Sequence, residues 1–217
     1  MYEALLAKDR YDIADLLEIM TILRSPTGCP WDREQTHASI RKSFVEETYE
    51  VIEAINKDDA ELLCEELGDV LLQVVFHAEL EREKGVFDFG DVCDGICKKL
   101  IVRHPHVFGD VTAETSEEVL SNWDVIKRRT KKQTTTTQAM ESVPRELPAL
   151  MRAQKLLHKG KKAGYEPEID PAGGIGQKLM AVLQEADRMD VDAEQALSDA
   201  ADAFLADFAA YEQNRTK

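Results

Sequence analysis

The sequence has little cysteine: four residues in a chain of 217, with no Cys-x-x-Cys pair among them. A disulfide framework is therefore not expected, and this usage is typical of a reducing cytosol. No apolar run approaches the roughly 20 residues that cross a bilayer. The first residues carry charge and lack the apolar stretch of a signal peptide. We therefore expect a cytoplasmic protein that has no membrane partner.

Basic charge is also scarce, because 27 Lys and Arg face 42 Asp and Glu, which gives a net charge of −15. Duplex DNA and anionic lipid would both be repelled at long range, so we expect no nucleic-acid partner. A small polyanion such as a nucleotide is not excluded. It can bind where metal ions and a few local Lys or Arg side chains reverse the sign of the charge.

The sequence also lacks the two-residue alternation of half-buried strands, and its periodic segments are helical in type. We therefore predict an all-α fold. The expected helices cover residues 12–23, 39–55, 60–83, 91–103, 116–132 and 149–162, with two Ala-rich helices between 175 and 211.

The composition changes after residue 130, which predicts three segments. Residues Lys131 to Thr137 have no apolar face, so 131–148 is expected to be a linker between a domain of residues 1–130 and a helical domain of residues 149–217.

Acidic residues gather on the helix expected at 39–55. Its apolar stripe consists of Ile40, Phe44, Val51 and Ile55. At about 100° per residue, Glu47 falls at the edge of this stripe and Glu50 lies roughly 60° further round. A glutamate that only kept the surface soluble would point away from the core. We interpret Glu46 and Glu53 in that way, but not Glu47.

The helix expected at 60–83 is apolar around most of its circumference, which predicts burial on nearly all sides. Its polar residues Glu66, Asp69 and Gln73 share one arc of roughly 60°. Buried carboxylates are costly unless they are protonated, paired with bases or bound to a metal. Four carboxylates on two adjacent helices would form an oxygen-only site suited to Mg²⁺ or Mn²⁺. The alternative is that they only decorate two helical surfaces.

At these residues the sequence resembles the MazG family of nucleoside triphosphate pyrophosphohydrolases. The family pattern is Glu-Glu-x-x-Glu followed by Glu-x-x-Asp, which here is Glu46-Glu47-Thr48-Tyr49-Glu50 and Glu66-Leu67-Gly68-Asp69. Three neighbouring stretches also match: Gly28-Cys29-Pro30-Trp31-Asp32 with Gln35-Thr36-His37, Arg103-His104-Pro105-His106-Val107-Phe108, and Ser121-Asn122-Trp123 before Lys127. The resemblance covers roughly residues 10 to 160.

The resemblance implies that Glu47, Glu50, Glu66 and Asp69 hold Mg²⁺. It also implies a helical bundle completed by dimerisation, with residues 1–130 as the catalytic domain. The expected reaction releases pyrophosphate and a nucleoside monophosphate, as a metal-bound water attacks the α-phosphorus. Glu47 and Glu50 would then be catalytic as well as ligands, and Glu46 would orient the water or act as the base.

Four further residues are expected at the substrate. Lys99 and Arg103 lie at i and i+4, hence on one helical face, and the matching family residues contact the triphosphate. The alternative is that their alkyl stems cover an exposed surface. Lys127 is the candidate in the next basic run, which is also compatible with an ordinary helix end. Trp31 is the candidate for stacking on the base, although a structural aromatic in a Pro-containing loop is an equal alternative.

Residues 149–217 resemble the same family more weakly. Leu183-Gln184-Glu185-Ala186-Asp187-Arg188 resembles the acidic motif, but Arg188 stands in place of the third glutamate. Ala203 and Asp207 occupy the positions that correspond to Lys99 and Arg103, and no Glu-x-x-Asp helix follows Glu185. We expect a degenerate second MazG-like domain without an active site.

Three other functions compete with this one. A di-iron carboxylate oxidase requires Glu-x-x-His on two helices, and none of the expected helices contains that motif. A non-catalytic nucleotide-binding or interaction module would use its acidic residues only for solubility. A narrower enzyme of the same type would hydrolyse dUTP, dCTP or phosphoribosyl-ATP instead of a broad range of NTPs and dNTPs.

Overall fold

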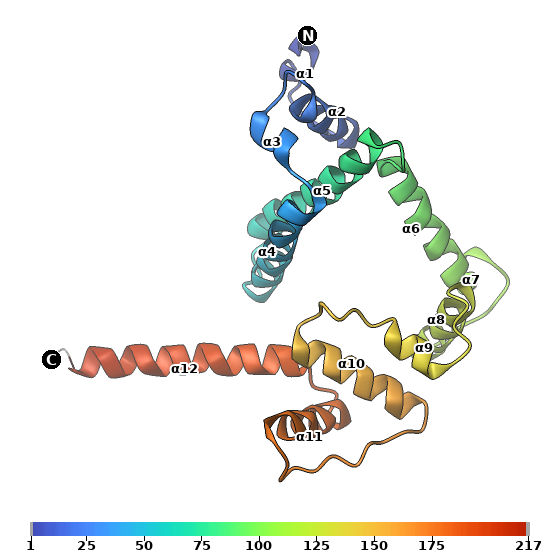
Figure 1. Ribbon diagram of the computed structural model, residues 1–217, viewed down its shortest axis with the longest axis vertical. Helices are drawn as coiled ribbons and strands as arrows, with labels where there is room; N and C mark the ends of the chain where they lie inside the picture. Colours follow the sequence, from blue (N-terminus) through green and yellow to red (C-terminus); the bar gives the residue numbers. More distant parts are fainter. Residues whose placement is uncertain (1, 216–217) are drawn as a thin grey trace. The chain divides into compact units, whose positions relative to one another are not determined.

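The computed structural model describes residues 2–215, and that range contains helices joined by turns and loops, without a strand. The all-α prediction is therefore confirmed. Most predicted helices begin or end within two residues of the observed bounds. The helices are α1 Glu3–Leu6, α2 Ile13–Arg24, α3 Pro30–Glu34, α4 His37–Asn56, α5 Ala60–Glu83, α6 Phe89–Arg103, α7 Pro105–Phe108, α8 Ser116–Thr130, α9 Thr136–Glu141, α10 Ala149–Lys162, α11 Ile175–Arg188 and α12 Ala193–Arg215 (Figure 1).

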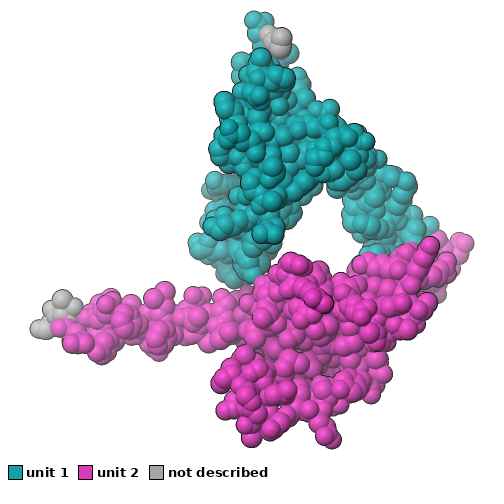
Figure 2. Space-filling view, in the orientation of Figure 1, with its two compact units in different colours: residues 1–108 teal, residues 109–217 magenta. Residues whose placement is uncertain are grey.

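The chain divides into two compact units, Met1–Phe108 and Gly109–Lys217 (Figure 2). The boundary lies earlier than the end of the predicted first domain at residue 130, so α8 belongs to the second unit. The predicted linker, residues 131–148, contains a short helix of its own, α9. Thr135 caps this helix, and its hydroxyl accepts a hydrogen bond from the Gln138 amide. The division into a catalytic and a degenerate MazG-like domain stays a prediction.

A helical hairpin of α4 and α5 is the framework of unit 1. The two helices pack along one another, and α2 crosses the second half of α5 (Figure 1). Their shared core consists of Met20, Ile40, Val75, Phe76 and Leu80. This core fixes the position of α5 along α4. It therefore determines which acidic side chains of the two helices lie opposite one another.

The beginning of α4 is fastened to α5 by a histidine pair. The Nδ1 atoms of His37 and His77 lie 2.7 Å apart, and Nε2 of His37 lies 2.6 Å from Oε1 of Glu81. The two rings stack with a centroid separation of 5.0 Å. Thr36 caps the same helix end, because its hydroxyl accepts from the Ser39 amide. These contacts fix the register of the hairpin.

Burial along α5 is uneven, which corrects the prediction of a helix covered on nearly all sides. The buried residues of α5 all lie between Gln73 and Leu80. In the first half, Leu67 is 51% exposed and Leu71 is 38% exposed. The physical reason is that the core formed with α2 lies beside the second half of α5, whereas the first half packs mainly against α4. The acidic residues lie in this less covered half.

Gly28 forms the tight bend between α2 and α3, and its backbone lies against the end of α2. A Cβ atom at this position would lie 2.2 Å from the Leu23 carbonyl oxygen and 2.3 Å from that of Ile22. Both contacts involve backbone atoms, so neither can be relieved by rotating a side chain. We therefore expect Gly28→Ala to lower the free energy of unfolding by about 3 kcal/mol, which urea denaturation would measure.

Gly95→Ala is the matched control for this substitution. Gly95 lies inside α6, and nothing lies within 4 Å of the Cβ position. A helix-interior Gly→Ala change of this kind is expected to raise the free energy of unfolding by about 1 kcal/mol. Equal stability of the Gly28→Ala variant and the unchanged protein would contradict the described bend.

Unit 2 has a smaller core, formed where α10 packs against α11. Leu157, Leu183 and Ala193 are its buried residues. α12 touches α10 near its own beginning and then continues with its side chains exposed. Within residues 2–215, no helix is long and apolar enough to cross a membrane.

Candidate metal centre

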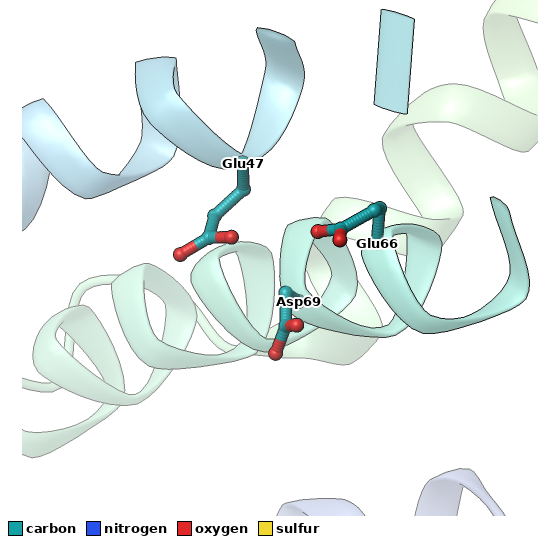
Figure 3. Close-up of side chains that lie close together, drawn as sticks. All are labelled: Glu47, Glu66 and Asp69. Carbon is teal, nitrogen blue, oxygen red and sulfur yellow. The ribbon is translucent and has the colours of Figure 1, made fainter. Parts of the chain in front are cut away.

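Three carboxylates from two helices converge in unit 1. Glu47 extends from α4 toward α5, where Glu66 and Asp69 stand one helical turn apart on the facing side (Figure 3). One oxygen from each side chain lies within 4.8 Å of the other two. The i, i+3 spacing places Glu66 and Asp69 on one face of α5, and the antiparallel hairpin brings Glu47 opposite them.

Crowding changes the ionisation of this cluster. Burial raises the pKa of Glu47, and the neighbouring Glu50 and Asp69 raise it further. Burial likewise raises the pKa of Glu66, with Glu50, Glu65 and Asp69 adding repulsion. Negative charge is therefore costly at this point unless a cation shares the space.

Glu50 is the fourth predicted ligand, and it borders the cluster without belonging to the set of three. Its side chain is exposed. Its carboxylate nevertheless contributes to the raised pKa of both Glu47 and Glu66, the first through a hydrogen bond. Its place as a fourth ligand stays a prediction.

Three cations on or next to these helices form ion pairs with carboxylates outside the cluster. Lys42 pairs with Glu46 at 2.9 Å, Lys57 with Glu53 at 2.6 Å, and Arg82 with Glu79 at 2.6 Å. The three side chains of the cluster offer only oxygen donors, and a bound cation would relieve the repulsion that raises the pKa of Glu47 and Glu66. An all-carboxylate donor set fits a hard divalent cation such as Mg²⁺ or Mn²⁺.

The other predicted site residues lie outside the three-carboxylate cluster. Glu46 is exposed and forms the pair with Lys42. Lys99 is exposed and Arg103 is half-buried, both toward the end of α6, which diverges from α5 after the turn at Gly85 (Figure 1). The roles predicted for these residues stay predictions.

The other two residues predicted at the substrate, Trp31 and Lys127, lie on α3 and α8. Trp31, on α3, is 62% exposed, and its stacking on the base stays a prediction. Lys127 belongs to α8 in unit 2, where its Nζ lies 5.0 Å from the centre of the Trp123 ring. It also lines a cavity of that unit.

Sequence reasoning missed His77, the partner of His37 at the beginning of the hairpin. A single histidine inside the apolar run of α5 carried no signal by itself. Its position one helical turn before Glu81 was the available indication, since both side chains then face α4 and both contact His37.

Comparison with known proteins agrees with this geometry. Residues 35–108, which include all of α4 and α5, match the model of the MazG nucleotide pyrophosphohydrolase domain. A nucleoside triphosphate pyrophosphohydrolase of Escherichia coli K12 is 46% identical over 187 residues, which are 86% of this chain and 69% of that protein. The chain belongs to the MazG family.

Other MazG relatives are similar over most of this chain. The nucleoside triphosphate pyrophosphohydrolase/pyrophosphatase MazG of Thermotoga maritima is 42% identical over 171 residues, covering 79% of the chain and 64% of the relative. A nucleoside triphosphate pyrophosphohydrolase of Mycolicibacterium smegmatis is 40% identical over 162 residues, covering 74% of the chain and 49% of the relative. The three-carboxylate cluster lies inside the segment that the MazG domain model matches.

Proposed function

We propose that this MazG protein hydrolyses nucleoside triphosphates between the α and β phosphates, releasing a nucleoside monophosphate and pyrophosphate. The observation that carries the proposal is the convergence of Glu47, Glu66 and Asp69, with one carboxylate oxygen of each within 4.8 Å of the other two. The family membership and the names of the relatives support the same reaction.

Glu47, Glu66 and Asp69 would hold the divalent cation in this proposal, and Glu50 would complete the set. The chemistry that Mg²⁺ or Mn²⁺ would supply there is charge neutralisation at the phosphates and activation of a water. The α4–α5 hairpin keeps the carboxylates in place before substrate arrives, so that little reorganisation is needed. Glu46, next to the ligands, orients the attacking water or accepts its proton.

The substrate needs contacts beyond the metal. Lys99 and Arg103 are one turn apart on α6 and provide positive charge for the triphosphate. The exposed indole of Trp31 stacks on the base, which requires no particular hydrogen-bond pattern and suits a broad range of NTPs and dNTPs. Lys127 is the fourth residue proposed at the substrate.

A homodimer is proposed as the active form. Apolar side chains are uncovered beside the carboxylates on α4 and α5, where Tyr49 is 48% and Leu67 is 51% exposed. α6 buries none of its residues and exposes Ile96 and Leu100 at i, i+4 spacing. Apolar faces of this kind are typical of surfaces that pair with another subunit. A second copy would cover them and exclude water from the site.

The second half is proposed to be a degenerate domain without a metal site. In α11, the carboxylate of Asp187 receives hydrogen bonds from His158 at 2.9 Å and from Lys161 at 3.0 Å. Side chains of the protein therefore take up the contacts that this carboxylate could offer to a metal. Arg188 lies near Glu166, with 3.4 Å between Nη2 and Oε2. Across the described part of the chain, Glu47, Glu66 and Asp69 are the one group of at least three His, Cys, Asp or Glu side chains that could hold a metal ion.

The product analysis is the deciding experiment. The protein is incubated with Mg²⁺ and a panel of standard and damaged NTPs and dNTPs, and the products are separated and identified. We expect pyrophosphate and the monophosphate from several bases. Orthophosphate and a diphosphate would overturn the proposed cleavage site. Turnover of dUTP, dCTP or phosphoribosyl-ATP alone would replace broad specificity by the narrow alternative.

A further inference from the structure

Gln73 of α5 belongs to the polar arc of this helix, but neither the core nor the proposed reaction accounts for it. It lies seven residues after Glu66 and four after Asp69, so at about 100° per residue its direction falls between theirs. One turn further along the same stripe, His77 contacts His37 of α4. Gln73 therefore lies on the side of α5 that faces α4, between the three-carboxylate cluster and the histidine pair.

The side-chain amide of Gln73 is buried without a donor for its oxygen. The residue is 9% exposed, and its Oε1 atom is enclosed and accepts no hydrogen bond from the described part of the chain. Ser43 lies one turn before Glu47 on the facing helix, yet its hydroxyl does not donate to this oxygen. A buried acceptor without a donor destabilises the folded state, and most buried polar groups in proteins do have a partner.

The geometry of the α-helix directs the Gln73 side chain toward the carboxylates. Each Cα–Cβ bond tilts toward the beginning of its helix, so a long side chain covers the turn that precedes it. The preceding turn carries Asp69, next to Glu66 and opposite Glu47 (Figure 3). The Gln73 side chain therefore leaves the helix in the direction of the three-carboxylate cluster rather than of the histidine pair.

A hydrated divalent cation would supply the missing donor. Mg²⁺ usually keeps several of its waters when carboxylates bind it, and such waters donate hydrogen bonds. Polar groups that orient the ligands around a metal commonly affect its affinity by about 10–100-fold when they are removed. An amide oxygen one turn from Asp69 is suited to this task.

We propose that Gln73 is a positioning residue of the metal centre, whose amide oxygen accepts a hydrogen bond from a water of the bound cation. The inference rests on the proposed function, because it uses the same cation at Glu47, Glu66 and Asp69. Gln73 does not itself bind the metal. A neutral acceptor holds a water in place without adding a further negative charge to carboxylates that already repel one another.

Mn²⁺ binding to the full chain, measured by electron paramagnetic resonance, tests this role without turnover. Gln73→Met keeps a long side chain but removes the acceptor, and it is expected to weaken Mn²⁺ binding about tenfold. It should also raise the urea midpoint of the metal-free protein, because a buried oxygen without a donor has been removed. A purely structural amide predicts the reverse, which is a lower midpoint and unchanged Mn²⁺ affinity.

Two further variants complete the test. Gln73→Glu retains an acceptor oxygen on a side chain of the same length, and we expect it to bind Mn²⁺ at least as tightly as the unchanged protein. Its metal-free form should unfold at a lower urea concentration at pH 7, because another carboxylate has joined Glu66 and Asp69. Gln177→Met makes the first substitution at an exposed position of α11, and neither Mn²⁺ affinity nor the urea midpoint should change appreciably.

Asp69→Asn separates this inference from the proposed function. If the unchanged protein binds no Mn²⁺, or if Asp69→Asn binds it equally well, the metal centre itself is wrong. If Asp69→Asn abolishes binding and Gln73→Met retains full affinity, the metal centre stands and the role of Gln73 is overturned. A lower urea midpoint for Gln73→Met would also overturn that role, because the amide oxygen would then have a partner in the folded protein.

Discussion

Asp69→Asn is expected to lower kcat/KM for nucleoside triphosphates at least about 10³-fold, equivalent to about 4 kcal/mol of transition-state stabilisation. The substitution keeps the size of the side chain and removes the negative charge that would hold the cation. The side chain is half-buried beside Glu47 and Glu66, on a helix whose core lies further along the chain, so the fold should be unaffected. Steady-state kinetics with a pyrophosphate-release assay would measure the loss.

Glu53→Gln is the matched control for this loss. Glu53 lies on α4 like Glu47, but its carboxylate pairs with Lys57 on the exposed side of the helix. It should retain turnover within about twofold, because exposed ion pairs of this type contribute little. Full activity of Asp69→Asn, or an equal loss in both variants, would contradict the assignment of the metal centre.

Glu47→Gln is expected to raise the stability of the metal-free protein and to reduce the stabilisation that Mg²⁺ provides. Without metal, the variant should unfold at a higher urea concentration than the unchanged protein at pH 7, because one of the repelling carboxylates has lost its charge. With metal, the unchanged protein should gain about 2.7 kcal/mol in free energy of unfolding when free Mg²⁺ is 100 times its Kd. The variant should gain little.

The pH dependence of the metal-free protein provides a second readout. The folded-state pKa values of Glu47 and Glu66 are raised above the ordinary value of 4.5 by burial and by their acidic neighbours. Below that value both groups are protonated whether the chain is folded or unfolded, so no repulsion opposes folding. As the pH rises above 4.5 and through the raised values, the metal-free protein loses stability.

Urea titrations between pH 4.5 and 8, with and without Mg²⁺, would follow this dependence. Glu53→Gln should follow the unchanged protein at every pH. The interpretation would be wrong if Mg²⁺ stabilised Glu47→Gln as much as the unchanged protein, or if metal-free stability did not depend on this carboxylate.

The local structure of the hairpin was predictable because its signals lie close together in sequence. The bounds of α5 were predicted as 60–83 and observed so, since the Asp59 side chain caps its start and Gly85, at a positive φ of 69°, follows its end. The spacing of Glu66 and Asp69 placed them on one face. The position of Glu47 relative to a stripe of its own helix correctly indicated that it faces α5.

The features that depend on distant contacts were not predictable. The apolar pattern of α5 shows which positions avoid water, but not that α2 covers only its second half. A cavity of unit 2 is lined by residues from Lys127 to Asp192, which are far apart in sequence. Lys155, Lys159 and Lys162 line it from α10, yet lysines at such spacing are also common on solvated helices.

The uneven burial of α5 has a consequence for how such sequences diverge. Positions 73–80 anchor the fold, whereas Glu66 and Asp69 stand in a stretch where replacement leaves that anchor intact. Mutations can therefore abolish chemistry without abolishing folding. A lineage carrying such a change keeps a well-formed scaffold that is released from selection on catalysis and is free to acquire a different ligand.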